Sequence, residues 1–195
     1  MNIFVTDRDA EVAAYYLCDV RARAMLRESV QMMSTAVHLL DPDFADGLYR
    51  PTHQNHPVTV WTRTRGSNFR WLLDHATALR VRVGEAHKSG LLLPALEAWF
   101  SRRYLRFPET EVAWHNHSPF VNAARNLERG VDFTYVADVH EAYRQYLEHR
   151  WFETDRRLPT WSHGRLPPWI TNAHKKLIVG DSVTYGTSTT TGPKP

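Results

Sequence analysis

The longest periodic segment of the chain predicts a helix over about residues 20–40. Its apolar residues recur at intervals of three and four, which places them on one face of an α-helix. This apolar stripe consists of Leu26, Val30, Met33, Val37 and Leu40. A second stripe on the same helix is mixed in character, and it consists of Arg21, Ala24, Glu28, Gln31 and Thr35. An arginine, a carboxylate and an amide in one row make this second face a candidate site.

Four further segments carry helical signals. Thr6, followed three residues later by Asp9, has the spacing of a capping box and predicts a helix over about 8–17. Capping residues and apolar periodicity predict three more helices: about 68–83 behind Ser67, 90–105, and about 139–149 behind Asp138. Residues 48–66 and 107–137 are expected to form loops and turns.

These elements predict a mainly α protein, a compact single helical domain over residues 1–178 with long irregular loops. Residues 179–195 are poor in apolar side chains and rich in Thr and Gly, so we expect a disordered tail there. A hydrophobic content of 43% and a charged content of 23% are typical of a globular protein. No segment approaches about 18 consecutive apolar residues, and the N-terminus has no leader pattern. We therefore expect a cytoplasmic monomer without membrane association.

Charge and cysteine content exclude only a few kinds of function. The formal net charge is +3, and arginine greatly outnumbers lysine, which permits a nucleic-acid partner without requiring one. The single cysteine, Cys18, excludes an internal disulfide and is expected in the core. Glycine-rich phosphate loops and the GxSxG elbow are absent from the sequence, so nucleotide-driven and serine-hydrolase chemistry have no support. We expect no cofactor.

Two histidine pairs raise the question of a metal. His53 and His56 are three residues apart, and His115 and His117 are two apart, so four nitrogen donors are conceivable. Neither spacing matches a helical zinc signature, and we expect no metal site, although the sequence leaves the group open.

Glu28 has two interpretations from the residues alone. It can pair with Arg21 or Arg27 on a partly exposed face, in a structural role. Alternatively, it lies in a cleft where reduced solvation and nearby arginines set its protonation state for acid or base work. The segment "WTRTRGSN" adds Arg63, Arg65 and Asn68 near a helix start, which is either a phosphate-binding element or an ordinary basic turn.

The stretch "LCDVRARAMLRESV" resembles the early helix of the phage endonuclease V-type pyrimidine-dimer DNA glycosylases. In that family an aspartate is followed nine residues later by the catalytic glutamate, and an arginine directly precedes the glutamate. Asp19, Arg27 and Glu28 have this spacing here. "HPVTVW" from His56 and "HEA" with "PTW" near the C-terminal end are similar to later family segments in the same order.

The resemblance implies a compact helical DNA glycosylase, with or without lyase activity, that acts on an extruded pyrimidine nucleotide of double-stranded DNA. The family's nucleophile is an α-amine; here Met1 is expected to be retained before Asn2, so its α-amine takes that place beside catalytic Glu28 and Arg27. The apolar "NIFV" start would anchor the terminus against the core, which predicts weak or no imine formation at Met1.

The resemblance and the local patterns together define the expected DNA contacts, which are Arg21, Gln31, His56, Arg63, Arg65, Asn68, Arg150 and Trp161. Arg63, Arg65, Arg150 and Trp161 are expected on one side of the molecule, around the mouth of a Glu28 pocket. Gln31 and Thr154 depart from the family, which has an arginine and a lysine at these places.

Three other functions stay open at this stage. The same scaffold could carry a transferase that hypermodifies DNA bases, with Glu28 as a general base. It could also be a non-catalytic DNA-binding protein in which Glu28 is structural, or a helical interaction protein without a nucleic-acid role.

Overall fold

The computed structural model describes residues 1–108 and 117–184 of the chain. This part is mainly helical, as predicted, and its α-helices are α1 (Ala10–Tyr16), α2 (Asp19–Leu40), α3 (Pro57–Thr64), α4 (Gly66–Val83), α5 (Leu93–Arg103), α6 (Val139–His149) and α7 (Asn172–Thr184). Short 3₁₀ turns cover Pro42–Phe44, Gly90–Leu92, Tyr104–Arg106 and Leu127–Arg129, and a π-helical turn covers Arg150–Thr154. A two-residue antiparallel pair joins β1 (Arg125–Asn126) to β2 (Val131–Asp132).

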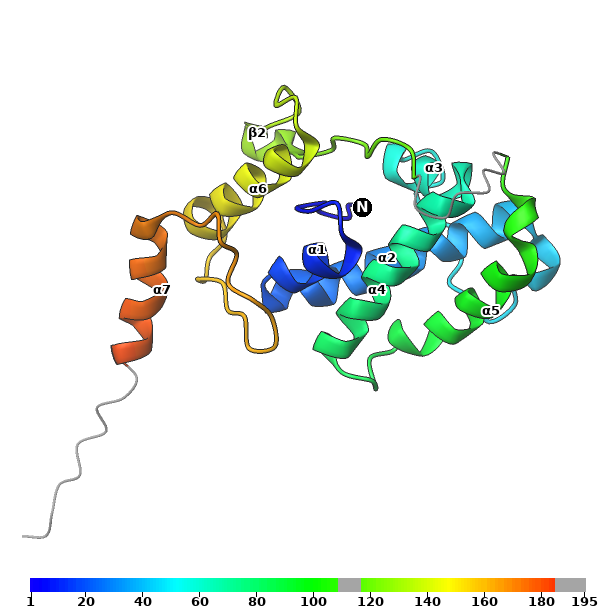
Figure 1. Cartoon of the computed structure of the whole chain (residues 1–195), viewed down its shortest axis with the longest axis horizontal. Coiled ribbons are helices and arrows are strands. Elements are labelled where there is room, and N and C mark those ends of the chain that lie inside the picture. Colours follow the sequence, from blue (N-terminus) through cyan, green and yellow to red (C-terminus); the bar gives the residue numbers. More distant parts are fainter. Residues whose placement is uncertain (109–116, 185–195) are drawn as a thin grey trace, which may run out of the picture.

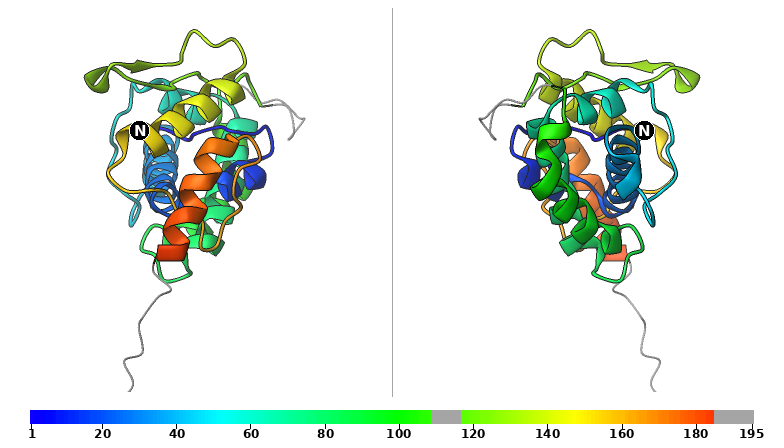
Figure 2. Two further views of the ribbon diagram at one scale, coloured as in Figure 1. Left: turned by 90° about the vertical axis from the view of Figure 1, so that its left-hand side faces the viewer. Right: turned by 90° about the vertical axis from the view of Figure 1, so that its right-hand side faces the viewer.

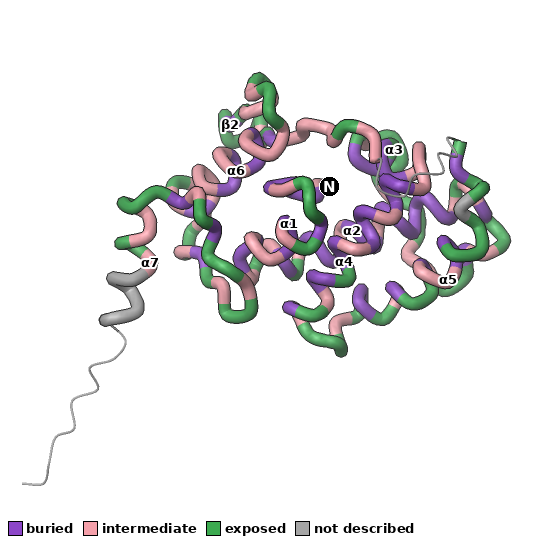
Figure 3. Tube along the Cα trace, in the orientation of Figure 1, coloured by how far each residue is buried: buried purple, intermediate pink, exposed green. Residues whose placement is uncertain are grey.

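The long helix α2 forms the centre of the core. It packs against α3 and α4, while α1 packs on α4. Figure 1 shows α6 and α7 at the end of the molecule where α2 begins, and α5 at the end where α2 finishes. The predicted apolar stripe of α2 is buried except for the half-buried Leu40, and the buried segments in Figure 3 follow α2 and the facing side of α4. The apolar stripe is thus taken up by the core, and the mixed stripe meets other partners.

Two helix starts show where local signals succeed and fail. Asp138 caps α6 as predicted, and its side chain accepts a hydrogen bond from the Glu141 N–H at 2.8 Å. The predicted cap Thr6 is wrong, since α1 begins after Asp9, whose carboxylate accepts from the Val12 N–H at 2.9 Å. An aspartate at this position also suits the positive end of the helix dipole.

Helix α3 corrects the loop expected over residues 48–66. His56 occupies the N-cap and its ring accepts from the Val58 N–H, while Pro57 stands at the first helical position, where a fixed φ is favourable. The valines and threonines of this short helix have low helix propensity, which concealed it. Burial of Val58 and Trp61 against the core outweighs that propensity. Helix α4 follows with Arg65, not Ser67, at its N-cap.

The C-terminal region contains a helix that the sequence patterns did not predict. The Glu148 carboxylate accepts from the Thr171 N–H at 2.9 Å and contacts the His174 ring at 2.7 Å, and that ring stacks on Phe152 at 4.1 Å. These contacts hold α7 against α6. Helix α7 continues to Thr184, into the predicted tail (179–195), and residues 185–195 lie outside the described residues.

The first residues of the chain lie inside the fold. Ile3, Phe4 and Val5 are buried, and the Phe4 ring stacks on Tyr146 at 5.9 Å and meets Tyr143 edge-on at 6.1 Å. The "NIFV" segment is therefore anchored, as predicted. The two views of Figure 2 show the N-terminus beside α2.

None of the helices in residues 1–108 and 117–184 combines the length and the apolarity that crossing a membrane requires.

Candidate functional site

Three of the four polar side chains of the mixed α2 stripe meet different incoming segments of the chain. Arg21 forms an ion pair with Asp155, which follows the π-helical turn. Thr35 accepts a hydrogen bond from the Thr52 N–H at 3.1 Å, in the loop before α3. Glu28, between them, receives the N-terminus. The polar residues of this stripe thus contact backbone groups and charges, whereas the apolar stripe is buried in the core.

Glu28 binds the start of the chain through one carboxylate oxygen. Its Oε2 accepts a hydrogen bond from the Asn2 N–H at 2.7 Å and lies 3.6 Å from the Met1 α-amino nitrogen. The Glu28 side chain is 21% exposed. One of the two interpretations of Glu28 paired it with Arg21 or Arg27, but Arg21 is paired with Asp155, and Arg27 is exposed. The positive partner of Glu28 is the chain terminus.

The side chain of Asn2 fixes this geometry. Its Oδ1 accepts from the Ile3 N–H at 2.9 Å and the Phe4 N–H at 3.4 Å, and its amide nitrogen donates to the Ala123 carbonyl at 3.1 Å. Phe4 has φ of 45°, in the left-handed region that a non-glycine residue rarely adopts. The burial of its ring holds this turn. Anchoring therefore keeps the amine beside Glu28, and the weak or absent imine formation predicted from the sequence stays a prediction for trapping to test.

His56 brings a neutral imidazole to the same place. Burial lowers its pKa, and the positive charges of the Met1 amine, His53 and Arg125 lower it further. A histidine with a lowered pKa is uncharged at neutral pH, and the Nδ1 lone pair of this ring accepts from the Val58 N–H. Arg125, an exposed residue of β1, had no sequence signal, because only the hairpin places it there. An amine, a carboxylate and a neutral imidazole together form the set of groups that nucleophilic catalysis uses.

Asn68 does not have the predicted role of a DNA contact. It is fully buried, and its amide nitrogen donates to the Trp61 carbonyl at 2.7 Å and to the Ser118 hydroxyl at 2.9 Å. Its carbonyl oxygen accepts from the Ser118 N–H at 2.9 Å. These bonds tie α3, α4 and residue 118 together, so this prediction is wrong and the residue is structural.

The other predicted DNA contacts are spread along α2. Arg150 binds Asp155 at 3.1 Å, near the Arg21 end of the helix. Arg63 donates to the Gln54 carbonyl, in the loop that meets Thr35. Arg21 and Thr35 are separated by about 20 Å of helix rise, so these arginines stand on either side of Glu28 along the helix and not in one cluster.

Trp161, Gln31 and Arg65 complete the predicted set. The Trp161 indole is half-buried, donates to the Tyr16 carbonyl at 2.9 Å and meets Trp151 edge-on. Gln31 is half-buried, on the mixed stripe one turn after Glu28. Arg65 stands at the N-cap of α4. Trp161 is thus held by the fold, while Gln31 lies nearest to the candidate site.

The histidines do not form a metal centre in the described part of the chain. Residues 1–108 and 117–184 contain no group of three or more potential ligands. The His53 ring bonds to the Thr52 hydroxyl at 2.7 Å, and the His117 ring contacts Phe120 at 4.4 Å. His115 lies outside the described residues.

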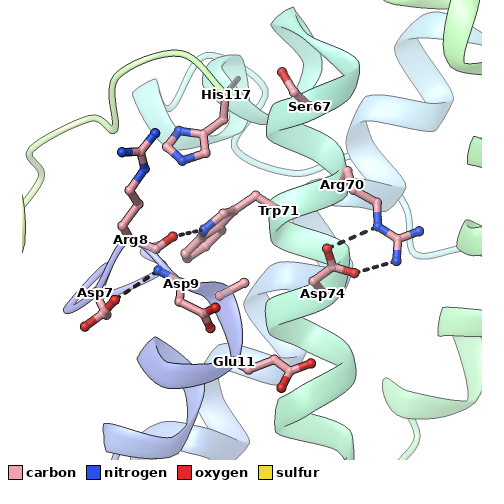
Figure 4. A pocket seen from close by; sticks show the side chains of 10 residues that line it. Asp7, Arg8, Asp9, Glu11, Ser67, Arg70, Trp71, Asp74 and His117 are labelled. Atoms are coloured by element: carbon pink, nitrogen blue, oxygen red, sulfur yellow. Dashed lines mark hydrogen bonds and ion pairs between the residues drawn. The ribbon is translucent and has the colours of Figure 1, made fainter. Parts of the chain in front are cut away.

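A separate cavity of about 500 Å³ lies between the start of α1 and helix α4 (Figure 4). Its walls are Asp7, Arg8, Asp9, Ala10, Glu11, Ser67, Arg70, Trp71, Asp74 and His117. Asp9 caps α1, and Asp74 is paired with Arg70 at 2.6 Å. The predicted site residues are not among its walls, so this cavity is distinct from the Glu28 site.

Comparison of the chain with protein-family models, curated proteins and solved structures gives no match. Function is therefore inferred from the geometry around Glu28, together with the resemblance carried by residues 17–30.

Proposed function

We propose that this protein is a DNA glycosylase that acts on an extruded pyrimidine nucleotide of double-stranded DNA, with the Met1 α-amine as its nucleophile. The observation that carries the proposal is the 3.6 Å separation between this amine and the Glu28 carboxylate. A terminal amine held by buried anchors beside a carboxylate is an unusual arrangement for a purely structural ion pair, because chain termini are commonly frayed. It also agrees with the spacing of Asp19, Arg27 and Glu28 in the sequence.

The groups support the following reaction. The neutral amine attacks the sugar C1′ while the glycosidic C–N bond breaks, and the base leaves with that electron pair and takes up a proton. The new ammonium nitrogen gives one proton to Glu28, which passes it to O4′ as the C1′–O4′ bond opens and an iminium forms. Water then hydrolyses the iminium to the amine and an abasic aldehyde. The net change is hydrolysis of the glycosidic bond.

Before this attack, the terminal ammonium must lose a proton. Solvent takes this proton, because the one lone pair of the neutral His56 ring, on Nδ1, already accepts from the Val58 N–H. Glu28 then stabilises positive charge at the sugar. Arg27 is exposed beside Glu28 on α2 and is free to approach a DNA phosphate.

The proposal is tested by an activity screen on ultraviolet-irradiated, undamaged and hypermodified duplexes, with products read by nucleoside mass spectrometry. The wild-type protein is compared with a variant that carries a Gly-Ser extension before Met1. We expect released pyrimidine lesions and abasic sites from the wild type, and none from the extended protein. A base of increased mass without abasic product would instead support the base-modifying transferase, and duplex binding without any product would support a non-catalytic DNA-binding protein.

A further inference from the structure

A second cavity, of about 390 Å³, opens beside the start of α2. Three parts of the chain form it: the start of α2 with the residue before it, the 3₁₀ turn of the β1–β2 hairpin, and the segment 151–159. Four arginines contribute to its walls against one aspartate, and these are Arg21, Arg129, Arg156, Arg157 and Asp155. We call this cavity the arginine pocket.

The single carboxylate of the arginine pocket is already in use. Asp155 is paired with Arg21 through one oxygen and with Arg150 through the other, the latter at 3.1 Å. One negative charge therefore faces two guanidinium groups, and the other three arginines of the pocket add further positive charge. The Arg21 Nε–H is also buried, and it has no acceptor among the residues that the structure describes. The pocket thus has a surplus of positive charge and a donor that lacks a partner.

The remaining arginines are exposed and available for a ligand. Arg129 reaches across from the hairpin and donates to the Thr154 carbonyl at 3.2 Å, which places its guanidinium at the pocket. Arg156 and Arg157 follow directly after Asp155 and are exposed. Val20, 71% exposed, provides an apolar wall. Guanidinium donors beside an apolar wall suit a phosphate together with its sugar, and the volume falls within the usual range for ligand sites.

We propose that the arginine pocket binds a backbone phosphate of the DNA strand whose nucleotide is processed at Glu28. This inference rests on the proposed function for the identity of the strand. Arg21 and Glu28 are seven residues apart, so they project from the same face of α2 and are separated by about 10 Å along its axis. That span corresponds to about three nucleotide steps of 3.4 Å in a duplex strand. For a duplex whose axis runs along α2, the pocket would hold the strand about three nucleotides from the reacting sugar.

The test compares two charge-matched double variants in binding to an undamaged, fluorescein-labelled duplex, measured by anisotropy over a series of salt concentrations. R156A/R157A removes two exposed arginines from the pocket. R102A/K88A removes two exposed cations on α5 and the turn before it, away from the arginine pocket. Competition by inorganic phosphate and thymidine monophosphate is measured in parallel, to separate a DNA phosphate from a free phosphate compound.

We expect R156A/R157A to weaken duplex binding about tenfold or more, and to reduce the slope of log K against log salt by about one to two. R102A/K88A should change the affinity less than twofold. Equal losses in both variants, an unchanged slope, or a loss confined to the phosphate competitors would each overturn the proposal. Base release is assayed separately. If R156A/R157A weakens binding as expected but the wild type releases no base, the phosphate-binding pocket is supported and the glycosylase function is refuted. If the wild type releases base but R156A/R157A binds like the wild type, the glycosylase function is supported and the pocket is refuted.

Discussion

Replacing Glu28 by glutamine separates a catalytic carboxylate from a structural one. The substitution keeps the shape of the side chain and an oxygen that can still accept from the Asn2 N–H, now 2.7 Å away. It removes the negative charge that faces the Met1 amine and the site that takes up its proton. A structural role predicts a loss of stability, and a catalytic role predicts a loss of turnover that greatly exceeds it.

The structure sets the size of the stability loss. Two unit charges at the observed 3.6 Å attract by about 4–5 kcal/mol at an effective dielectric constant of about 20. Access of water to the half-buried pair and the cost of ordering the terminus cancel most of this, so the net loss should be about 1 kcal/mol. For a domain of this size that lowers Tm by about 2–4 °C. Loss of the proton acceptor should lower turnover by about 100-fold or more, equivalent to about 2.7 kcal/mol.

Glu148→Gln is the matched control. Glu148 is 17% exposed and, like Glu28, accepts from one backbone N–H and faces one positive or chargeable group, here Thr171 and His174. Calorimetry should therefore show similar small losses of Tm for the two variants. Single-turnover base release should fall only in Glu28→Gln, and duplex affinity should stay near the wild-type value in both. Equal activity of the two variants, or unfolding of Glu28→Gln, would refute the catalytic role.

Three further substitutions or truncations test other parts of the structure. Asn2→Ala removes the bonds that hold the terminus and should slow base release about tenfold with unchanged duplex affinity, as measured by single-turnover kinetics and anisotropy. Burial lowers the pKa of His75 to about 3, below the unfolded value of about 6.5, so the unfolded state binds the extra proton and stability falls with pH below 6.5. Urea unfolding should show that the wild type loses about 2 kcal/mol more than His75→Leu between pH 7 and 5; equal losses would contradict this. Truncation after Gly180 should leave Tm and activity unchanged, since Thr171 and His174 precede it; a lower Tm would show that the last turn of α7 contributes.

Parts of the fold whose signals are local could be predicted from the sequence. The apolar stripe of α2 and the cap Asp138 both act within a few residues, and each appears in the structure as expected. Helix α3 was missed because its residues have low helix propensity and its stability comes from burial of Val58 and Trp61. Tertiary packing determines whether such segments become helical, and the packing partners cannot be recognised in a single sequence.

The candidate site was only half predictable for the same reason. The mixed stripe identified Glu28, but its partners are the Met1 amine and the Asn2 N–H, the latter twenty-six positions away, and no pattern within α2 could indicate them. Asn68 has the residue type of a phosphate contact, yet its amide nitrogen donates its hydrogen bonds to Trp61 and Ser118 inside the protein. Arg125 acts on this site only through its charge, which lowers the pKa of His56, and only the hairpin gives it that place. Residue type and spacing thus identified the carboxylate, whereas its partners are determined by the tertiary fold.

Borohydride trapping tests the central claim, that the Met1 α-amine is the nucleophile, most directly. The protein is incubated with a duplex that contains the processed lesion, borohydride reduces any iminium to a stable amine, and peptide mass spectrometry locates the adduct. We expect one adduct on the N-terminal peptide, at the Met1 nitrogen, and its loss when a Gly-Ser extension precedes Met1. Abasic product without an adduct at Met1, or an adduct on a lysine that persists in the extended protein, would contradict the assignment.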